Sequence, residues 1–190
     1  MRLVAICALL WVSTAFAEEI TIVLDFQGPS NNQSVAEMKR EFTGIMKDSA
    51  LTFDWKSRAE AEKIGVPNLV VVRFKGICIL RPVPYLYDER GPLAFTYSTD
   101  GAVQPFSEVK CDEVTRVVRS VMSGGDFAHA DVLMGRALGR VLAHEIVHIL
   151  TKSGDHGTGG VAKPALSGRQ LIDGELRLEP EDLERLRVDH

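Results

Sequence analysis

The sequence predicts an α+β fold in a single domain, with a mixed β-sheet packed on one long helix. Three observations favour this fold. Candidate strands and helices follow one another without strict alternation. A helical pattern over residues 128–152 carries a continuous apolar side. The chain has 190 residues, of which 45% are hydrophobic and 25% charged, as in one ordinary globular domain.

The charge balance excludes several classes of protein. The formal net charge is −4, which argues against a strongly basic surface for nucleic acid. The composition also excludes a disordered acidic tail, a collagen-like chain and a multi-pass membrane protein. We therefore expect no nucleic-acid partner.

The first seventeen residues have the three parts of a secretory signal peptide. Arg2 supplies a positive start, residues 3–12 are apolar, and Ala15-Phe16-Ala17 forms an A-x-A cleavage pattern. The apolar run is shorter than the roughly 20 residues that span a membrane. We expect cleavage to leave residues 18–190 as the functional domain, secreted or periplasmic and without stable membrane insertion.

Two cysteines remain after the predicted cleavage, Cys78 and Cys111. An even count in an exported chain favours a disulfide between them. Two buried free thiols are the alternative. Cys7 lies inside the apolar run and not at the cleavage site, so a lipoprotein anchor is not expected.

The remaining elements follow from hydrophobic periodicity and from glycine and proline breaks. Gly135 and Gly139 predict close packing of the long helix against the sheet, and Gly154 is expected to end that helix. The loop 82–92 is expected to line a cleft. The predicted elements are strands 20–26, 51–55 and 68–80, a hairpin of 93–98 with 103–109, and helices about 32–49, 58–64, 112–122, 128–152 and 179–187.

The long helix contains the motif H-E-x-x-H at residues 144–148. His144 and His148 are four residues apart, so both imidazoles project from the same helical face. Their nitrogens can meet at one zinc ion about 2.0–2.1 Å away. Zinc lowers the pKa of its bound water towards about 7, and Glu145 is placed to accept the proton as general base.

A hydrolytic zinc site usually has three protein ligands and one open position. The best third candidate is His156, which a turn at Gly154 would bring back towards the helix. Asp155 is the runner-up, and Glu175 and Glu179 are more distant options.

A non-metal interpretation of the motif also exists. In it the two histidines are polar helix residues and Glu145 pairs with Arg140. Arg136 and Arg140 continue the histidine stripe towards the helix start. They are expected either to form salt bridges or to orient a ligand.

The stretch HEIVHILTKSGDH resembles the zinc-binding segment of the metzincin-like metallopeptidases, especially small secreted bacterial members with H-E-x-x-H-x7-H. The resemblance implies that His144, His148 and His156 bind Zn²⁺ and that Glu145 is the general base. It also implies hydrolysis of peptide bonds in a cleft beside an edge strand, where the substrate pairs as an added strand.

Two features depart from the usual metzincin pattern. The third histidine follows the second by eight residues instead of six, and no methionine after Met134 can form the family's methionine turn. The segment 159–167 takes the place of that turn, with Ala165 or Leu166 as the floor of the site.

The sequence therefore predicts a secreted zinc-dependent metallopeptidase that acts on a peptide or protein substrate. Two alternatives stay open. One is an exported zinc hydrolase of a non-protein amide, and the other is a metal-binding or interaction domain without catalysis. The sequence does not define the oligomeric state.

Overall fold

The computed structural model describes residues 18–63, 68–80 and 91–188, and within them the α+β prediction is confirmed. The predicted signal peptide and most of the predicted cleft loop 82–92 lie outside the described residues. The elements are β1 Glu19–Phe26, α1 Asn32–Met46, β2 Thr52–Ser57, α2 Arg58–Ala61, β3 Leu69–Lys75, β4 Ala94–Thr99, β5 Ala102–Lys110, α3 Cys111–Val121, the 3₁₀ helix η1 Gly124–His129, α4 Ala130–Leu150, α5 Gly168–Ile172 and α6 Pro180–Val188.

The five strands form one mixed sheet in the order β2-β1-β3-β5-β4. β1 pairs in parallel with β2 and β3, and β3 pairs in parallel with β5. β4 runs antiparallel to β5 and forms one edge of the sheet, as the predicted hairpin requires. An edge strand leaves one row of backbone groups free to pair with another chain.

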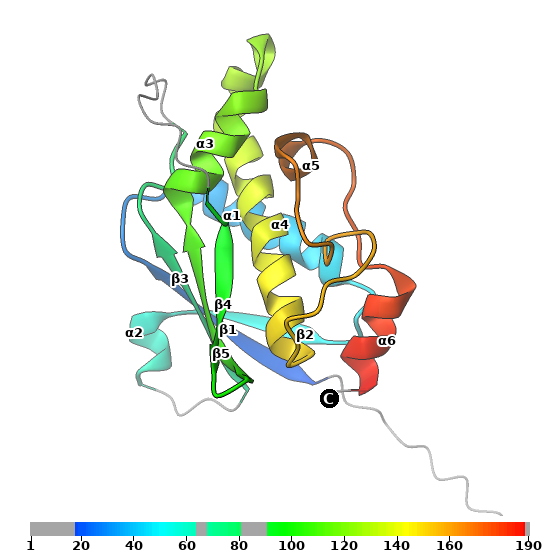
Figure 1. Cartoon of the computed structure of the whole chain (residues 1–190). Helices are drawn as coiled ribbons and strands as arrows, with labels where there is room; N and C mark the ends of the chain where they lie inside the picture. The colour runs from blue at the N-terminus through cyan, green and yellow to red at the C-terminus, as the bar shows by residue number, and fades with distance from the viewer. Residues whose placement is uncertain (1–17, 64–67, 81–90, 189–190) are drawn as a thin grey trace, which may run out of the picture.

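Helix α4 lies between the sheet and the C-terminal segment that contains α5 and α6 (Figure 1). Its apolar residues, such as Leu138 and Leu142, share one buried core with Phe42 of α1 and with Val72 and Phe74 of β3. α4 is therefore covered on several sides, which explains why its hydrophobic residues are not confined to one narrow stripe.

The two glycines of α4 contact α1 and not the sheet, so the predicted role of this pair is corrected. A Cβ atom at Gly135 would lie 2.5 Å from the Ser34 carbonyl oxygen. One at Gly139 would lie 2.7 Å from the Met38 carbonyl oxygen. The glycines allow the two helix backbones to approach where a side chain would collide.

Strand β3 ends five residues earlier than predicted. Gly76 has a φ of +89°, which turns the chain out of the sheet after Lys75. Cys78 then lies close enough to Cys111, at the start of α3, for the predicted disulfide, which is confirmed. Both cysteines are buried. A disulfide is typical of extracellular and periplasmic proteins.

Both ends of the long helix also differ from the prediction. It begins at Ala130, after η1, because Ser123 and Asp126 form a capping box that starts a separate turn. It ends at Leu150, and the left-handed residue that follows is Lys152, with a φ of +49°. The expected break at Gly154 is therefore wrong by two residues.

The C-terminal segment contains a short helix, α5, that the sequence patterns did not predict. Ser167 and Gln170 form its capping box. Across the described ranges, no helix combines the length and the apolar character needed to cross a lipid bilayer.

Candidate metal centre

Two imidazoles from consecutive turns of α4 converge on one point. The Nε2 atoms of His144 and His148 are 3.1 Å apart, and the ring centroids are 4.7 Å apart. The spacing of four residues places both rings on one helical face, as predicted. His148 is 8% exposed, and His144 is partly buried.

Backbone carbonyls hold both rings in orientation. His144 Nδ1 lies 2.9 Å from the Val161 carbonyl oxygen, and His148 Nδ1 lies 2.8 Å from the Ser153 carbonyl oxygen. A carbonyl oxygen only accepts, so each Nδ1 carries the proton and each Nε2 presents a lone pair. Burial lowers the pKa of both imidazoles, which favours the neutral form that ligates metals.

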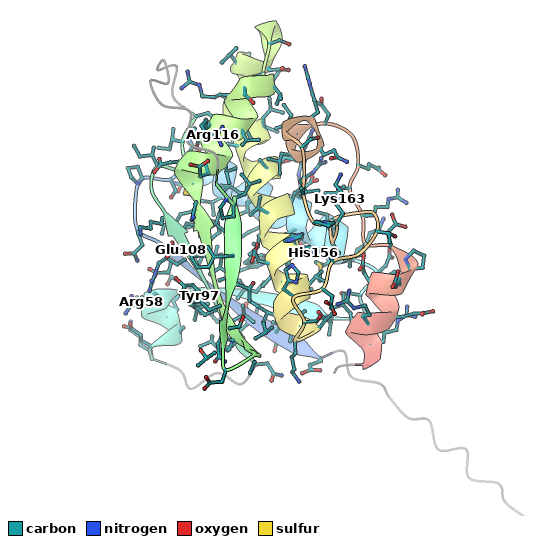
Figure 2. The ribbon with its side chains drawn as sticks, viewed as in Figure 1. Arg58, Tyr97, Glu108, Arg116, His156 and Lys163 are labelled. Carbon is teal, nitrogen blue, oxygen red and sulfur yellow. A yellow bond between two sulfur atoms is a disulfide. The ribbon has the colours of Figure 1, made fainter. Side chains whose placement is uncertain are left out.

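His156 completes the group from the loop after α4. Its ring centroid lies 5.3 Å from that of His144 and 4.8 Å from that of His148. Each of the three histidines offers one nitrogen, and these nitrogens all lie within 4.8 Å of one another. Figure 2 shows the His156 side chain lying across α4.

The other predicted third ligands are not part of this group. Asp155 is turned to the Ser153 hydroxyl, which donates to its Oδ2 at 3.0 Å. Glu175 pairs with Arg177, and Glu179 lies against Gly159. The sequence-based choice of His156 over these carboxylates agrees with the geometry.

The donor set fits a divalent transition metal. Two Nε2 lone pairs that face each other at 3.1 Å repel unless a cation lies between them. A tetrahedral zinc ion with bonds of about 2.0–2.1 Å separates its ligands by about 3.3 Å. Three imidazoles beside an open cavity match the ligand count of catalytic zinc sites.

Glu145 lies beside the histidines and is 4% exposed. Its Oε2 accepts a 2.7 Å hydrogen bond from Thr96 Oγ1 on β4, and Ser107 Oγ on β5 lies 3.3 Å away. Burial raises the pKa of Glu145, while the Thr96 and Ser107 hydrogen bonds and the nearby His148 oppose that shift. A buried carboxylate with a raised pKa is suited to accept and return a proton.

Glu145 does not pair with Arg140, so the non-metal interpretation of that residue is wrong. Arg140 instead contacts Glu41 at 2.7 Å and donates to the carbonyl oxygens of Gln170, Asp173 and Gly174. Arg136 donates to the Ile172 carbonyl oxygen. Both arginines hold the C-terminal segment against α4 through these hydrogen bonds, so their role is structural.

A cavity of about 570 Å³ opens over the histidines. Thr96 and its neighbours on the edge strand β4 form one wall, and Pro164, Ala165 and Leu166 form part of another. Part of the segment 159–167 therefore lines the cavity, and this part includes Ala165 and Leu166, the two residues suggested from the sequence as its floor. Of the predicted cleft loop, Gly91 and Pro92 reach the cavity, and the remainder lies outside the described residues.

Sequence reasoning missed the hydroxyl groups that hold Glu145. Thr96 and Ser107 are opposite each other in the β4/β5 register, on the face that meets α4. Side chains along a strand alternate between the two faces of the sheet, and this alternation in the predicted hairpin places Thr96 and Ser107 on the same face. Nothing in the sequence indicates that this face meets Glu145.

Comparison with known proteins does not assign a family. No protein-family model matches the sequence, and no curated protein matches it. Fold and site together define a class, an α+β protein with a candidate three-histidine metal site. Any function must be argued from the geometry of that site.

Proposed function

We propose that this chain is a secreted or periplasmic zinc-dependent peptidase of metzincin-like type. The single observation that carries the proposal is the convergence of three histidine nitrogens within 4.8 Å of one another, two from the helix that also bears Glu145 and one from the loop that follows it. His144, His148 and His156 would hold the metal. The Cys78–Cys111 disulfide supports an extracytoplasmic location.

Bound zinc would supply a Lewis acid that polarises the scissile carbonyl and acidifies an attacking water. Glu145 would serve as the general base that accepts a proton from water and returns one to the leaving amine. The carbonyls of Val161 and Ser153 keep the imidazoles of His144 and His148 in the ligating tautomer.

The walls of the cavity favour a peptide over a small amide. Within the described residues no strand pairs with the outer edge of β4, and an extended peptide would add there by main-chain hydrogen bonds. Apolar side chains line the cavity beyond the histidines, namely Leu93, Val117, Val141 and Leu166. We expect the substrate to place an apolar side chain there.

The substitution Glu145→Gln tests the proposal. It preserves size and removes the proton acceptor, so cleavage of casein or of an apolar-containing peptide should fall by about 10²–10⁴-fold. Bound zinc, measured by atomic emission, should stay at the wild-type level because the histidines are intact. Chelation of the wild-type protein should abolish cleavage, and re-addition of zinc should restore it.

Glu184→Gln is the matched control, because Glu184 is an exposed glutamate on α6. It should cleave like the wild type. Full activity in Glu145→Gln would exclude Glu145 as the base. Zinc binding without cleavage of peptides would favour a non-protein amide substrate or a non-catalytic metal-binding domain.

A further inference from the structure

We propose that Thr96 is a positioning residue, through which the edge strand β4 holds the general base in its working orientation. The inference rests on the proposed function and adds a residue to it. Thr96 lies on the wall of the cavity, and its hydroxyl contacts Glu145 directly.

The contact between Thr96 and Glu145 has the geometry of a strong hydrogen bond. Thr96 Oγ1 lies 2.7 Å from Glu145 Oε2, a distance typical of a hydroxyl that donates to a carboxylate. The two residues are 49 positions apart in the sequence. The bond therefore joins the edge of the sheet to the helix that carries the histidines.

Thr96 is a stronger donor to Glu145 than Ser107 is. Each hydroxyl has one hydrogen to give. Ser107 Oγ lies 3.0 Å from the Phe95 carbonyl oxygen and 3.3 Å from Glu145 Oε2, so it has a nearer acceptor elsewhere. The other acceptor of Thr96, the Glu145 carbonyl oxygen, lies at 3.4 Å. Thr96 thus gives its hydrogen to the carboxylate.

The hydrogen bond fixes how the carboxylate is rotated. The terminal torsion of a glutamate is broad, so an unheld carboxylate samples many orientations. With Oε2 held by Thr96, Oε1 is the oxygen left for the cavity. Glu145 itself lines the cavity.

The same strand would therefore bind the substrate and orient the base. A peptide that adds to the outer edge of β4 lies in a fixed position relative to Thr96. Because Thr96 holds Glu145, the base and the scissile bond are placed by one element. Correct placement of the base raises the rate of the chemical step more than it strengthens substrate binding.

Thr96→Val tests the proposal in the zinc-loaded full chain. Valine has the branched shape of threonine without the donor, so kcat should fall about tenfold or more while KM changes less than about twofold. Thr96→Ser restores the donor and should recover most of kcat. Ser107→Ala should have the smaller effect. Thr43→Val, at an exposed position of α1, is the matched control and should leave kcat unchanged.

A second measurement does not depend on activity. Denaturant unfolding of wild type, Thr96→Val, Glu145→Ala and the double variant, all with chelator present, gives the coupling between the two side chains. We expect Thr96→Val to change the free energy of unfolding less than half as much in the Glu145→Ala background as in the wild type.

The outcomes separate the two proposals. Additive effects on unfolding, or an unchanged kcat in Thr96→Val, would overturn the positioning role. A fall in kcat that Thr96→Ser does not rescue would overturn it too. If the wild type cleaves no peptide while the coupling is present, the proposed function fails and the catalytic role of Thr96 fails with it, whereas the hydrogen bond stands.

Discussion

Backbone carbonyls decide which nitrogen of each helix histidine faces the site. Both carbonyls come from the segment that follows α4, one at Ser153 and one at Val161. That segment rests on the start of α6, where Asp182 Oδ1 would lie 3.0 Å from a Cβ atom at Gly157. Burial lowers the pKa of His144, and the charge of Asp182 opposes that shift only in part. The orientation of the ligands thus depends on residues that do not ligate.

Burial of the charged Asp182 carboxylate lowers the stability of the folded protein, and this effect depends on pH. Its Oδ2 accepts from the Glu179 backbone N–H at 3.2 Å, while Oδ1 has no hydrogen-bond partner among the described residues and lies 3.9 Å from Arg185 Nη1. Burial raises the pKa of Asp182 above its ordinary value of 3.8. The folded chain therefore binds this proton at higher pH than the unfolded chain does, and the charged form opposes folding above the folded-state pKa.

Asp182→Asn should accordingly stabilise the protein at pH 7. The amide keeps an oxygen for the Glu179 N–H and removes the buried charge. The gain in melting temperature should shrink as the pH falls through the raised pKa of the wild-type carboxyl, because that carboxyl then takes up a proton and loses its charge. Melting curves at pH 4.5 and 7 measure this, with exposed Glu184→Gln as a control that should not stabilise. A lower melting temperature for Asp182→Asn at pH 7 would contradict the account.

At the scale of helices and strands, the contact between α1 and α4 sets the positions of His144 and His148. Gly139 is one turn or so before His144 and lies against the backbone of α1. Lys152 then turns the chain back, so that His156 returns to the helix. The position of His156, the third candidate ligand, depends on how α4 packs against α1 and on where α4 ends.

Gly139→Ala should destabilise the protein by about 1–3 kcal/mol, because its Cβ would lie 2.7 Å from the Met38 carbonyl oxygen. Gly44→Ala is the matched control. Gly44 is inside α1 with open space around it, and alanine should stabilise it by about 0.5–1 kcal/mol. Urea unfolding measures both, and a stabilised Gly139→Ala would show that the helices do not pack closely there.

Sequence patterns predicted the parts of the site that depend on periodicity. A spacing of four residues places His144 and His148 together without tertiary information. His156 was found because it is near in sequence, although the turn that brings it back is made by Lys152 and not by Gly154. Thr96 could not be assigned, since its contact with Glu145 depends on how the sheet meets α4. Tertiary packing also decided that Gly139 faces a helix.

For the whole molecule, three parts distant in sequence meet at the cavity. The edge strand contributes Thr96, the long helix contributes two histidines and Glu145, and the C-terminal segment contributes His156 and the wall at Pro164–Leu166. The Cys78–Cys111 disulfide closes a loop that contains β4 and β5, with a stabilising effect of about 3–4 kcal/mol for a loop of this length. Among the described residues, the fold brings a buried glutamate, a candidate metal site and the edge strand β4 to one place.

The most direct test of this account is the zinc content and zinc affinity of the purified chain 18–190, compared with His156→Ala. We expect one zinc per wild-type chain and an affinity reduced by at least about 100-fold in His156→Ala, since one of three protein ligands is lost. His129→Ala, an exposed histidine on η1, should bind like the wild type. A wild-type chain that binds no zinc, or a His156→Ala chain with unchanged affinity, would contradict the three-histidine site.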